Sequence, residues 1–445
     1  MKLRLEAQHA RRFGAVAALI ALLATAAFAA DPYAAMGLNI TPGANGKELN
    51  FAWFSTSRAA KPAVQITPKT GQNGDFFPTS KAKTFTGTSV KVTATQFNGD
   101  DATVETGAFA NKVTVSGLID STDYIYRVGD GSSWSKANPI STRDQSSFGF
   151  LVVGDPQVGA KSSGPKTLDS DAAGWKDTLA KAVDAYPKTS FLVSLSDEVN
   201  DYNKVATQDA EYAAYFAPPQ LLSLPVATIE GNHDFAVGEY YGFHYNLPNL
   251  SPTYGTSYGN DGDYWFVYGN AIFLVLNSNA ESIATHDVFI REALAKNPSA
   301  LWRIACFHHS VYSEADHFAD PDIIDRRSNF PSVFERYNID LVLQGHDHAY
   351  TRTLPMLKGK PVEGSDPSAA SVSSPKGITY VTFNSGSGSK FYDWKDAAPE
   401  PFSAARWQGK VPSFGYLSIE GKKLSLSVYR TDDMSSIDSF FIEKN

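Results

Sequence analysis

Five short motifs of the chain combine aspartate, asparagine and histidine, side chains that can bind metal ions. The motifs are Gly154-Asp155-Pro156-Gln157, Ser196-Asp197, Gly231-Asn232-His233-Asp234, His308-His309 and Gly345-His346-Asp347-His348. Each motif follows an apolar run, at residues 148–153, 191–195, 224–229, 301–307 and 339–343. These runs have the length and composition of buried β-strands. Because loops after strand ends form the ligand-binding crevice of α/β folds, we expect the five motifs to converge.

The donor atoms indicate which ions these side chains suit. Nitrogen and oxygen donors without a thiolate favour borderline cations such as zinc, manganese or iron. Two such ions about 3.5–4 Å apart can hold the attacking and leaving oxygens of an in-line displacement at phosphorus. A water on such an ion loses its proton near about pH 7, so no serine or cysteine nucleophile is needed. The single cysteine, Cys306, lies within an apolar run, which favours a core role.

In their order, the motifs resemble the calcineurin-like metallophosphoesterases, in particular the purple acid phosphatases and their bacterial relatives with an N-terminal fibronectin-like domain. The resemblance extends over nearly the whole mature chain, including residues 341–350 and the glycine-rich residues 384–390. It implies that residues 148–445 form an α/β metallophosphoesterase domain, a four-layer sandwich with helices outside two central mixed sheets. It also implies a centre of two divalent or trivalent metal ions that hydrolyses phosphate esters through a metal-bound hydroxide.

The resemblance also implies a role for each site residue. One metal is assigned to Asp155, Gln157 and His348, and the other to Asn232, His308 and His346, with the Asp197 carboxylate bridging both. His233 is implied to be the general acid that protonates the leaving alkoxide, a contribution typically worth about 10²–10⁴-fold. His309 is a candidate for contacting substrate, for supporting a metal ligand or for filling space. Asn200 and Asp234 are candidates for supporting the site from behind the ligands.

Three positions depart from the family pattern. Gln157 stands where many relatives have histidine, and its neutral oxygen shifts the expected preference towards harder ions. Ser196 stands where glycine is usual, so we expect its Cβ to strain the turn before Asp197. Asn200 stands where purple acid phosphatases carry a metal-bound tyrosine, so no purple colour is expected. Protein phosphatases of the family carry aspartate there, and Asn200 would stabilise a protonated His233 less.

Residues 31–144 differ from the rest of the chain in their pattern of apolar and polar residues. Short alternating runs at 49–55, 63–67, 112–116 and 124–128 predict a small all-β sandwich. Leu118 and Tyr124, followed by Tyr126, resemble the corner of a fibronectin type III domain. No catalytic cluster occurs in this region, which favours a structural or docking module. After residue 148, helices are predicted at 174–186 and 286–295, and an exposed loop at 361–375.

Residues 1–29 have the pattern of a signal peptide. Basic residues precede an apolar run at 14–27, and Ala27-Phe28-Ala29 fits a cleavage site. The run is shorter than the roughly 20 residues that span a bilayer. We therefore expect an exported protein, periplasmic or secreted, without a transmembrane segment after signal removal.

The overall charge and the motifs limit the kinds of function that the protein can have. A formal charge of −8 argues against nucleic acid as a partner, whereas bound cations make a small phosphorylated substrate compatible with it. The leading hypothesis is an exported phosphomonoesterase. A phosphodiesterase or nucleotidase with the same core is the first alternative. The second alternative is a noncatalytic cell-envelope binding protein that keeps a degenerate metal site.

Overall fold

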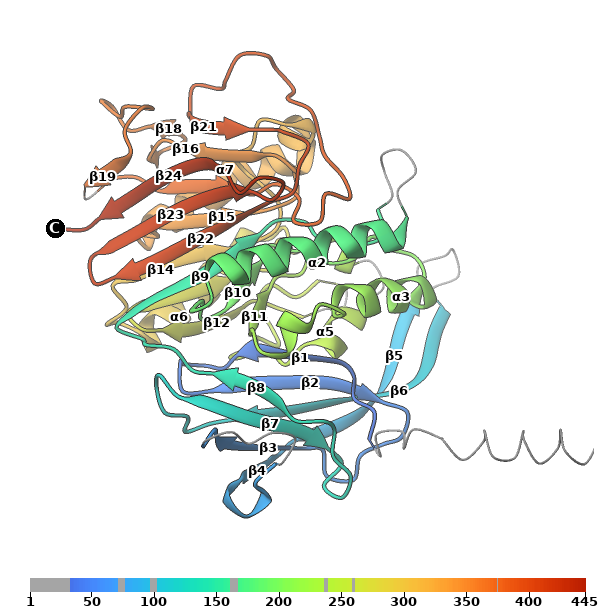
Figure 1. The fold of residues 1–445 in the computed structure, drawn as a ribbon. Coiled ribbons are helices and arrows are strands. Elements are labelled where there is room, and N and C mark those ends of the chain that lie inside the picture. Colours follow the sequence, from blue (N-terminus) through green and yellow to red (C-terminus); the bar gives the residue numbers. More distant parts are fainter. Residues whose placement is uncertain are drawn as a thin grey trace, which may run out of the picture.

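A computed structural model of the chain describes residues 33–70, 77–96, 102–160, 167–235, 239–257, 261–373 and 375–445. The predicted signal peptide lies outside these residues. Within them, no helix combines the length and the apolar character needed to cross a bilayer. A β-sandwich, blue to teal in Figure 1, packs against a larger α/β body. The change between them falls after β8, which ends at Ser141, and before β9, which begins at Ser147.

The N-terminal part is a sandwich of two antiparallel four-stranded sheets. One sheet has the order β1 (Met36–Pro42), β2 (Leu49–Ser55), β6 (Ala102–Val115), β5 (Thr88–Gln96), and the other β4 (Lys83–Thr86), β3 (Ala63–Pro68), β7 (Asp123–Gly129), β8 (Asn138–Ser141). A 3-10 turn, η1 (Thr79–Lys81), precedes β4. Phe51, Trp53 and Tyr126 fill the space between the sheets. The Tyr124 hydroxyl accepts a hydrogen bond of 2.8 Å from the Ile119 amide, a tyrosine corner as in immunoglobulin-like sandwiches.

Two mixed seven-stranded sheets form the centre of the α/β body. The first has the order β11 (Val226–Thr228), β10 (Leu192–Ser194), β9 (Ser147–Val153), β22 (Ser413–Glu420), β23 (Lys423–Arg430), β24 (Ser436–Glu443), β19 (Ser371–Ser373). The second has the order β12 (Tyr264–Tyr268), β13 (Ala271–Val275), β14 (Trp302–Cys306), β15 (Leu341–Gln344), β20 (Thr379–Thr382), β16 (Tyr350–Thr353), β21 (Ser403–Trp407). A two-stranded hairpin, β17 (Met356–Leu357) with β18 (Lys360–Pro361), follows β16.

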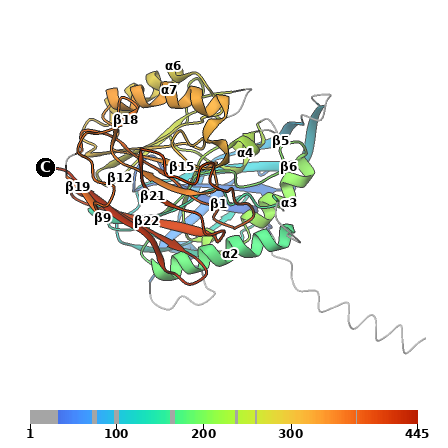
Figure 2. The same ribbon diagram turned by 90° about the horizontal axis from the view of Figure 1, so that it is seen from above.

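Helices cover the outer face of each sheet, which gives four layers (Figure 2). The helices are α2 (Leu168–Ala185), α3 (Val205–Tyr215), α4 (Asn232–Phe235), α5 (Tyr240–His244), α6 (Ile283–Lys296) and α7 (Pro321–Arg336), with 3-10 turns η2 (Pro219–Leu222) and η3 (Asp316–Ala319). Along β9, Phe150 packs between the sheets and Leu151 packs outward against Trp175 of α2. Because both faces of β9 are covered, its sequence is a continuous apolar run. The predicted fold class is confirmed.

The sandwich forms three side-chain hydrogen bonds to one segment of the α/β body, residues 242–246. Lys112 Nζ donates to the Gly242 carbonyl oxygen at 2.6 Å, and Asn39 Nδ2 donates to the His244 carbonyl oxygen at 2.8 Å. Thr41 Oγ1 donates to the Asn246 carbonyl oxygen at 2.7 Å. The segment overlaps α5, which follows the Asn232-His233-Asp234 motif in the chain and lies beside β1 of the sandwich (Figure 1).

Candidate metal centre

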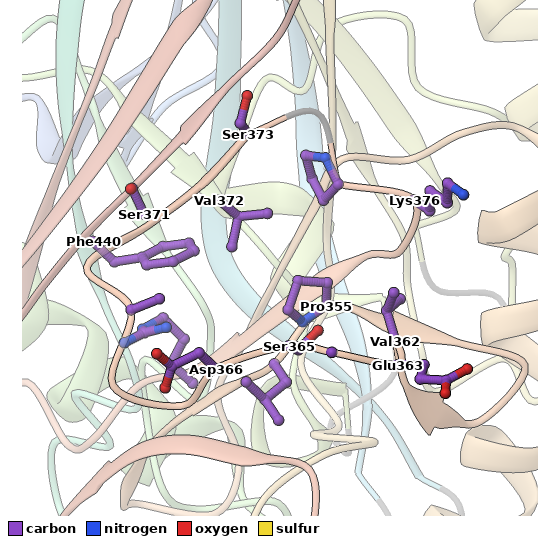
Figure 3. A pocket seen from close by; sticks show the side chains of 15 residues that line it. Pro355, Val362, Glu363, Ser365, Asp366, Ser371, Val372, Ser373, Lys376 and Phe440 are labelled. Atoms are coloured by element: carbon purple, nitrogen blue, oxygen red, sulfur yellow. The ribbon is translucent and has the colours of Figure 1, made fainter.

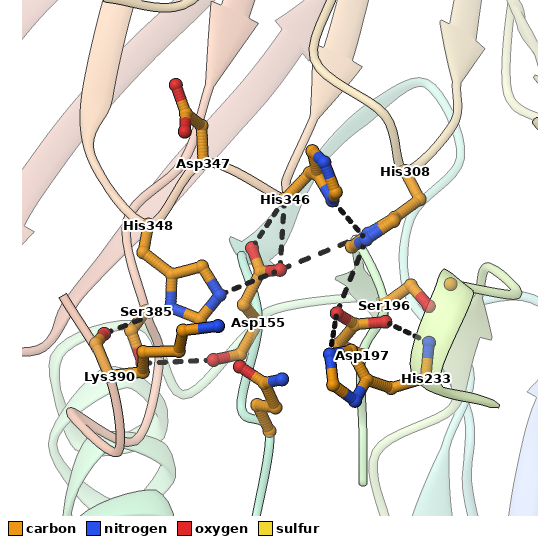
Figure 4. Close-up of polar contacts among 12 residues, drawn as sticks. Asp155, Ser196, Asp197, His233, His308, His346, Asp347, His348, Ser385 and Lys390 are labelled. Carbon is orange, nitrogen blue, oxygen red and sulfur yellow. Dashed lines mark hydrogen bonds and ion pairs between the residues drawn. The ribbon is translucent and has the colours of Figure 1, made fainter. Parts of the chain in front are cut away.

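The five motifs come together at the junction of the two sheets (Figure 4). Three of them follow the mutually parallel strands β9, β10 and β11 of the first sheet. The other two follow the parallel strands β14 and β15 of the second sheet. Six residues of these loops have positive φ angles, namely Asp155 (36°), Gln157 (34°), Ser196 (82°), Asp197 (38°), His346 (72°) and His348 (44°). Such conformations are uncommon outside glycine and concentrate at functional sites.

Three donor atoms lie close to the Nε2 atom of His308. The His308 Nδ1–H donates to the Leu195 carbonyl oxygen at 3.0 Å, so Nε2 is the nitrogen that faces these atoms. Nε2 lies 3.0 Å from Asn232 Oδ1, 3.1 Å from His346 Nδ1 and 3.4 Å from Asp197 Oδ2. Ligands about 2.1 Å from a tetrahedral ion lie roughly 3.4 Å from one another. The three distances from Nε2 are therefore compatible with ligands that share one transition-metal ion.

A second group of donors lies beside Asp155. The His348 Nδ1–H donates to the Lys390 carbonyl oxygen at 3.0 Å, and Nε2 faces Asp155 Oδ1 at 3.5 Å. Gln157 is fully buried, and its Oε1 has no hydrogen-bond partner among the described residues. A buried carbonyl oxygen without a partner is costly unless a ligand satisfies it. These residues fit a second ion.

The two groups are adjacent. Ligand atoms of Asp155, Asp197 and His308 all lie within 4.8 Å of one another, and the three side chains are buried. The Asp155 carboxylate also accepts hydrogen bonds of 2.9 and 2.8 Å from the His346 amide, which fixes its orientation. A centre of two neighbouring ions with Asp197 between them is therefore compatible with the arrangement.

Burial sets the charge of the ligands. It lowers the pKa of His346 well below its usual value, and with the nearby Lys390 it lowers that of His348 to about 3. Both rings are therefore neutral, the form that binds metal. Burial also raises the pKa of the Asp155 carboxyl. Burial opposes protonation of His308, but the carboxylates of Asp197 and Asp155 outweigh it and raise the pKa to about 9, so His308 releases a proton when it binds a metal ion.

His233 lies at the edge of the centre with one nitrogen held and one free. Its Nδ1–H donates to the carbonyl oxygen of Asn200 at 2.5 Å, and its Nε2 lies 4.0 Å from Asp197 Oδ2. The family resemblance implied that the Asn200 side chain lies beside this ring, but the contact is made by the Asn200 backbone. The Asn200 side chain instead accepts a 3.3 Å hydrogen bond from Gln157 Nε2.

Asp234 and His309 lie behind the ligands. Asp234 is fully buried and accepts hydrogen bonds from the amides of Gly231, Glu198 and Val199 at 3.3–3.4 Å, so it joins two of the loops. The ring of His309 lies 4.8 Å from that of His346, and its Nδ1 is 2.8 Å from Ser278 Oγ. Of the roles considered from sequence, this position favours packing against His346.

His317 and Tyr392, which the sequence did not single out, lie beside the ligands His346 and His348. The ring of His317 lies 4.4 Å from that of His346, its Nδ1 is 2.7 Å from Asp320 Oδ2, and its Nε2 is 3.1 Å from the Tyr392 hydroxyl. His317 lies in η3, nine residues after His308, and not directly at a strand end. This nine-residue separation from His308 was the one feature of the sequence that could have pointed to His317.

A cavity of about 440 Å³ lies away from the five motifs. It is bounded by residues of β16, β19 and β24 and by residues 362–366 (Figure 3). Arg352 in its wall is already paired with Asp438, with Nε 2.6 Å from Oδ2 and Nη2 3.2 Å from Oδ1. Residues of the five motifs are absent from its lining. This cavity is therefore separate from the candidate metal centre.

Comparison with known protein families agrees with the arrangement of the centre. Residues 148–350, which contain all five motifs, match the family described as calcineurin-like phosphoesterase. This part of the chain belongs to that family. Residues 36–142 match the purple acid phosphatase N-terminal domain, so the two domains together are those of a purple acid phosphatase-like metallophosphoesterase. The predicted family and hydrolase class are confirmed.

Several known proteins are similar to this metallophosphoesterase in sequence, and one solved structure is similar to it in fold. It is 22% identical over 339 residues to acid phosphatase type 7 of Danio rerio, covering 70% of this chain and 71% of the relative. It is 24% identical over 360 residues to purple acid phosphatase 1 of Ipomoea batatas, covering 75% and 70%. The structure of purple acid phosphatase PPD1 from yellow lupin (Lupinus luteus) seeds superposes with a TM-score of 0.73 at 17% identity, covering 93% of this chain and 75% of the lupin chain.

Proposed function

We propose that the protein hydrolyses phosphate monoesters with two metal ions held by the residues of the five motifs. The observation that carries the proposal is the set of three donor atoms, from three different loops, that lie 3.0–3.4 Å from His308 Nε2 of a fourth loop. One ion would be held by Asn232, His308 and His346, the other by Asp155, Gln157 and His348, and Asp197 would contact both. When bound, the ions supply Lewis acidity, which neutralises phosphoryl oxygens and lowers the pKa of water.

His233 would act at the leaving oxygen. Hydrolysis forms a bond between a water oxygen and phosphorus, and the ester oxygen departs with the electron pair of the broken P–O bond. The departing oxygen needs a proton, and the Asn200 carbonyl oxygen holds the His233 Nδ1–H so that Nε2 can deliver one. The products are an alcohol and inorganic phosphate. The Nε2 orientation towards Asp197 supports an enzyme over a noncatalytic binding protein, because a purely structural metal needs no acid there.

The experiment is a paired assay of the metal-loaded protein on 4-nitrophenyl phosphate and bis(4-nitrophenyl) phosphate. We expect faster turnover of the monoester, and faster turnover of the diester would favour the phosphodiesterase alternative. His233→Ala is expected to lower kcat by about 10²–10⁴-fold with its metal content unchanged. Wild-type protein that binds metal but turns over neither ester would favour the binding-protein alternative.

Export is part of the proposal and rests on the sequence pattern of residues 1–29. Mass spectrometry of the protein from a fractionated host would give a mature chain starting at residue 30 in the periplasm or medium. An unprocessed chain in the cytosol would contradict export and leave the proposed chemistry untouched.

A further inference from the structure

One large aromatic side chain next to His233 faces solvent. Tyr202 is 50% exposed, and among the described residues it is the one aromatic in the group of large exposed apolar side chains. Its ring meets the ring of His233 edge to face, with 5.5 Å between centroids and 71° between planes. A solvent-facing aromatic ring beside a candidate catalytic group offers apolar surface that a bound group can cover.

The loop that carries Tyr202 is held in place. Glu211 of α3 accepts hydrogen bonds from the amides of Asn200 and Asp201 at 2.9 and 2.8 Å. The Asp201 carboxylate in turn accepts from the amides of Asn203 and Lys204, at 2.7 and 3.0 Å, just before α3 begins. The backbone on both sides of Tyr202 is therefore fixed, and the exposed ring is presented by an ordered turn.

The position of Tyr202 relative to the reaction follows from His233. If His233 Nε2 protonates the leaving oxygen, the group attached to that oxygen must extend from the phosphorus past the His233 ring. Asp197 lies on the metal side of the ring, and the exposed ring of Tyr202 also borders His233. A planar apolar leaving group that reaches Tyr202 can stack on it, whereas a small polar alcohol gains little there.

We propose that Tyr202 binds the leaving group and gives the enzyme a preference for aryl phosphate monoesters over alkyl ones. The inference rests on the proposed function, because the role of His233 defines where the leaving group lies. Aromatic contacts of this kind contribute roughly 0.5–1.5 kcal/mol beyond buried area, which corresponds to a change of up to about ten-fold.

The kinetic test compares wild type, Tyr202→Ala and Tyr202→Phe on phenyl phosphate, naphthyl phosphate and glycerol phosphate. Tyr202→Ala is expected to lose about ten-fold in kcat/KM on naphthyl phosphate, less on phenyl phosphate, and under about two-fold on glycerol phosphate. Tyr202→Phe keeps the ring and is expected to match wild type. Ile324→Ala, which removes an exposed apolar side chain of α7, is the matched control. An equal loss on all three substrates, or none on the aryl esters, would overturn the inference.

A binding measurement separates failure of this inference from failure of the proposed function. Phenylphosphonate and methylphosphonate cannot be hydrolysed, so calorimetry on metal-loaded protein reports recognition alone. Weaker binding of phenylphosphonate to Tyr202→Ala, with unchanged methylphosphonate, supports the assignment even if wild type hydrolyses no ester. Equal binding of phenylphosphonate to both proteins contradicts the role of Tyr202 even if the enzyme is active.

Discussion

The hydroxyl of Ser196 donates a 2.7 Å hydrogen bond to Oδ2 of Asp234. Ser196 precedes the central ligand Asp197, and Asp234 follows His233, so this contact joins the loop that carries the metal ligand to the loop that carries the acid. Ser196 has a φ angle of 82°, a conformation that glycine adopts more readily. The hydroxyl offsets part of that strain through a group that glycine lacks.

Substitutions of Ser196 separate the cost of backbone strain at this residue from the contribution of its hydrogen bond to Asp234. Ser196→Ala keeps the Cβ and leaves Asp234 with one donor fewer, so we expect a loss of about 1–3 kcal/mol in the free energy of unfolding. Ser196→Gly loses the same hydrogen bond but recovers roughly 1–2 kcal/mol of backbone strain. Denaturant unfolding should therefore rank wild type and glycine above alanine. An alanine variant as stable as wild type would show that the hydroxyl contributes nothing.

Asn200→Ala tests the support of Gln157. The Asn200 side chain orients the Gln157 amide, so its removal is expected to weaken metal binding by about ten-fold, as for other residues that hold a ligand in place. Because the backbone carbonyl of Asn200 holds His233, kcat at saturating metal should stay close to wild type. Metal titration followed by activity measures both effects. A loss of kcat as large as that of His233→Ala would contradict the assignment of separate roles to the side chain and the backbone of Asn200.

Lys112→Met tests the contact between the two domains. The buried ammonium group donates to the Gly242 carbonyl oxygen, and burial lowers the pKa of Lys112. Removing a charged donor from this position is expected to cost about 1.5–3 kcal/mol of unfolding free energy. Lys91→Met is the matched control, since Lys91 pairs with Glu105 on the exposed surface and should cost about 0.5 kcal/mol or less. Equal effects of the two substitutions would exclude Lys112 as an anchor.

Because His244 is buried, we expect the free energy of unfolding to fall at acidic pH. Its ring packs 3.8 Å from that of Tyr212, neither nitrogen has a hydrogen-bond partner among the described residues, and burial lowers its pKa to about 3. The unfolded chain binds this proton as the pH falls through about 6.5, but the folded chain does so only near pH 3. The unfolded state therefore binds more protons between these values, and stability drops as pH falls.

From pH 8 to pH 5 this one group should cost wild type about 2 kcal/mol. His244→Phe removes the titrating ring, so the difference in unfolding free energy between the two pH values should shrink by that amount. If the variant and wild type lose the same stability on acidification, the burial of a neutral His244 is not the cause.

The sequence predicted the strands and their ends well because covered strands have continuous apolar runs. The run at 148–153 corresponds to β9, and the polar residues after it do lie at the centre. The family resemblance implied two sheets, but the residues do not indicate which of the five strands belongs to which sheet, because pairing between distant segments leaves no local pattern. Helix α7 was also missed, since Pro331 within it and its polar composition weaken the helical pattern.

The parts of the site that depend on contacts between loops could not be predicted. The expected strain at Ser196 was derived from its Cβ alone, because the position of Asp234 beside its hydroxyl follows only from the fold. The Asn200 side chain was placed by analogy, and the backbone contact to His233 has no signature in residue type. His317 reaches His346 from a 3-10 turn, where strand periodicity gives no information.

Elemental analysis of the purified protein measures how many metal ions the five motifs hold. We expect two metal ions per chain in wild type, and in Asp197→Asn a loss of at least one ion together with turnover, because Asp197 lies between both ligand groups. His286→Asn is the control, since the buried His286 ring contacts Asp263 and the Ala280 carbonyl oxygen and is not one of the proposed ligands. Less than one ion per chain in wild type, or two ions retained by Asp197→Asn, would contradict the binuclear centre.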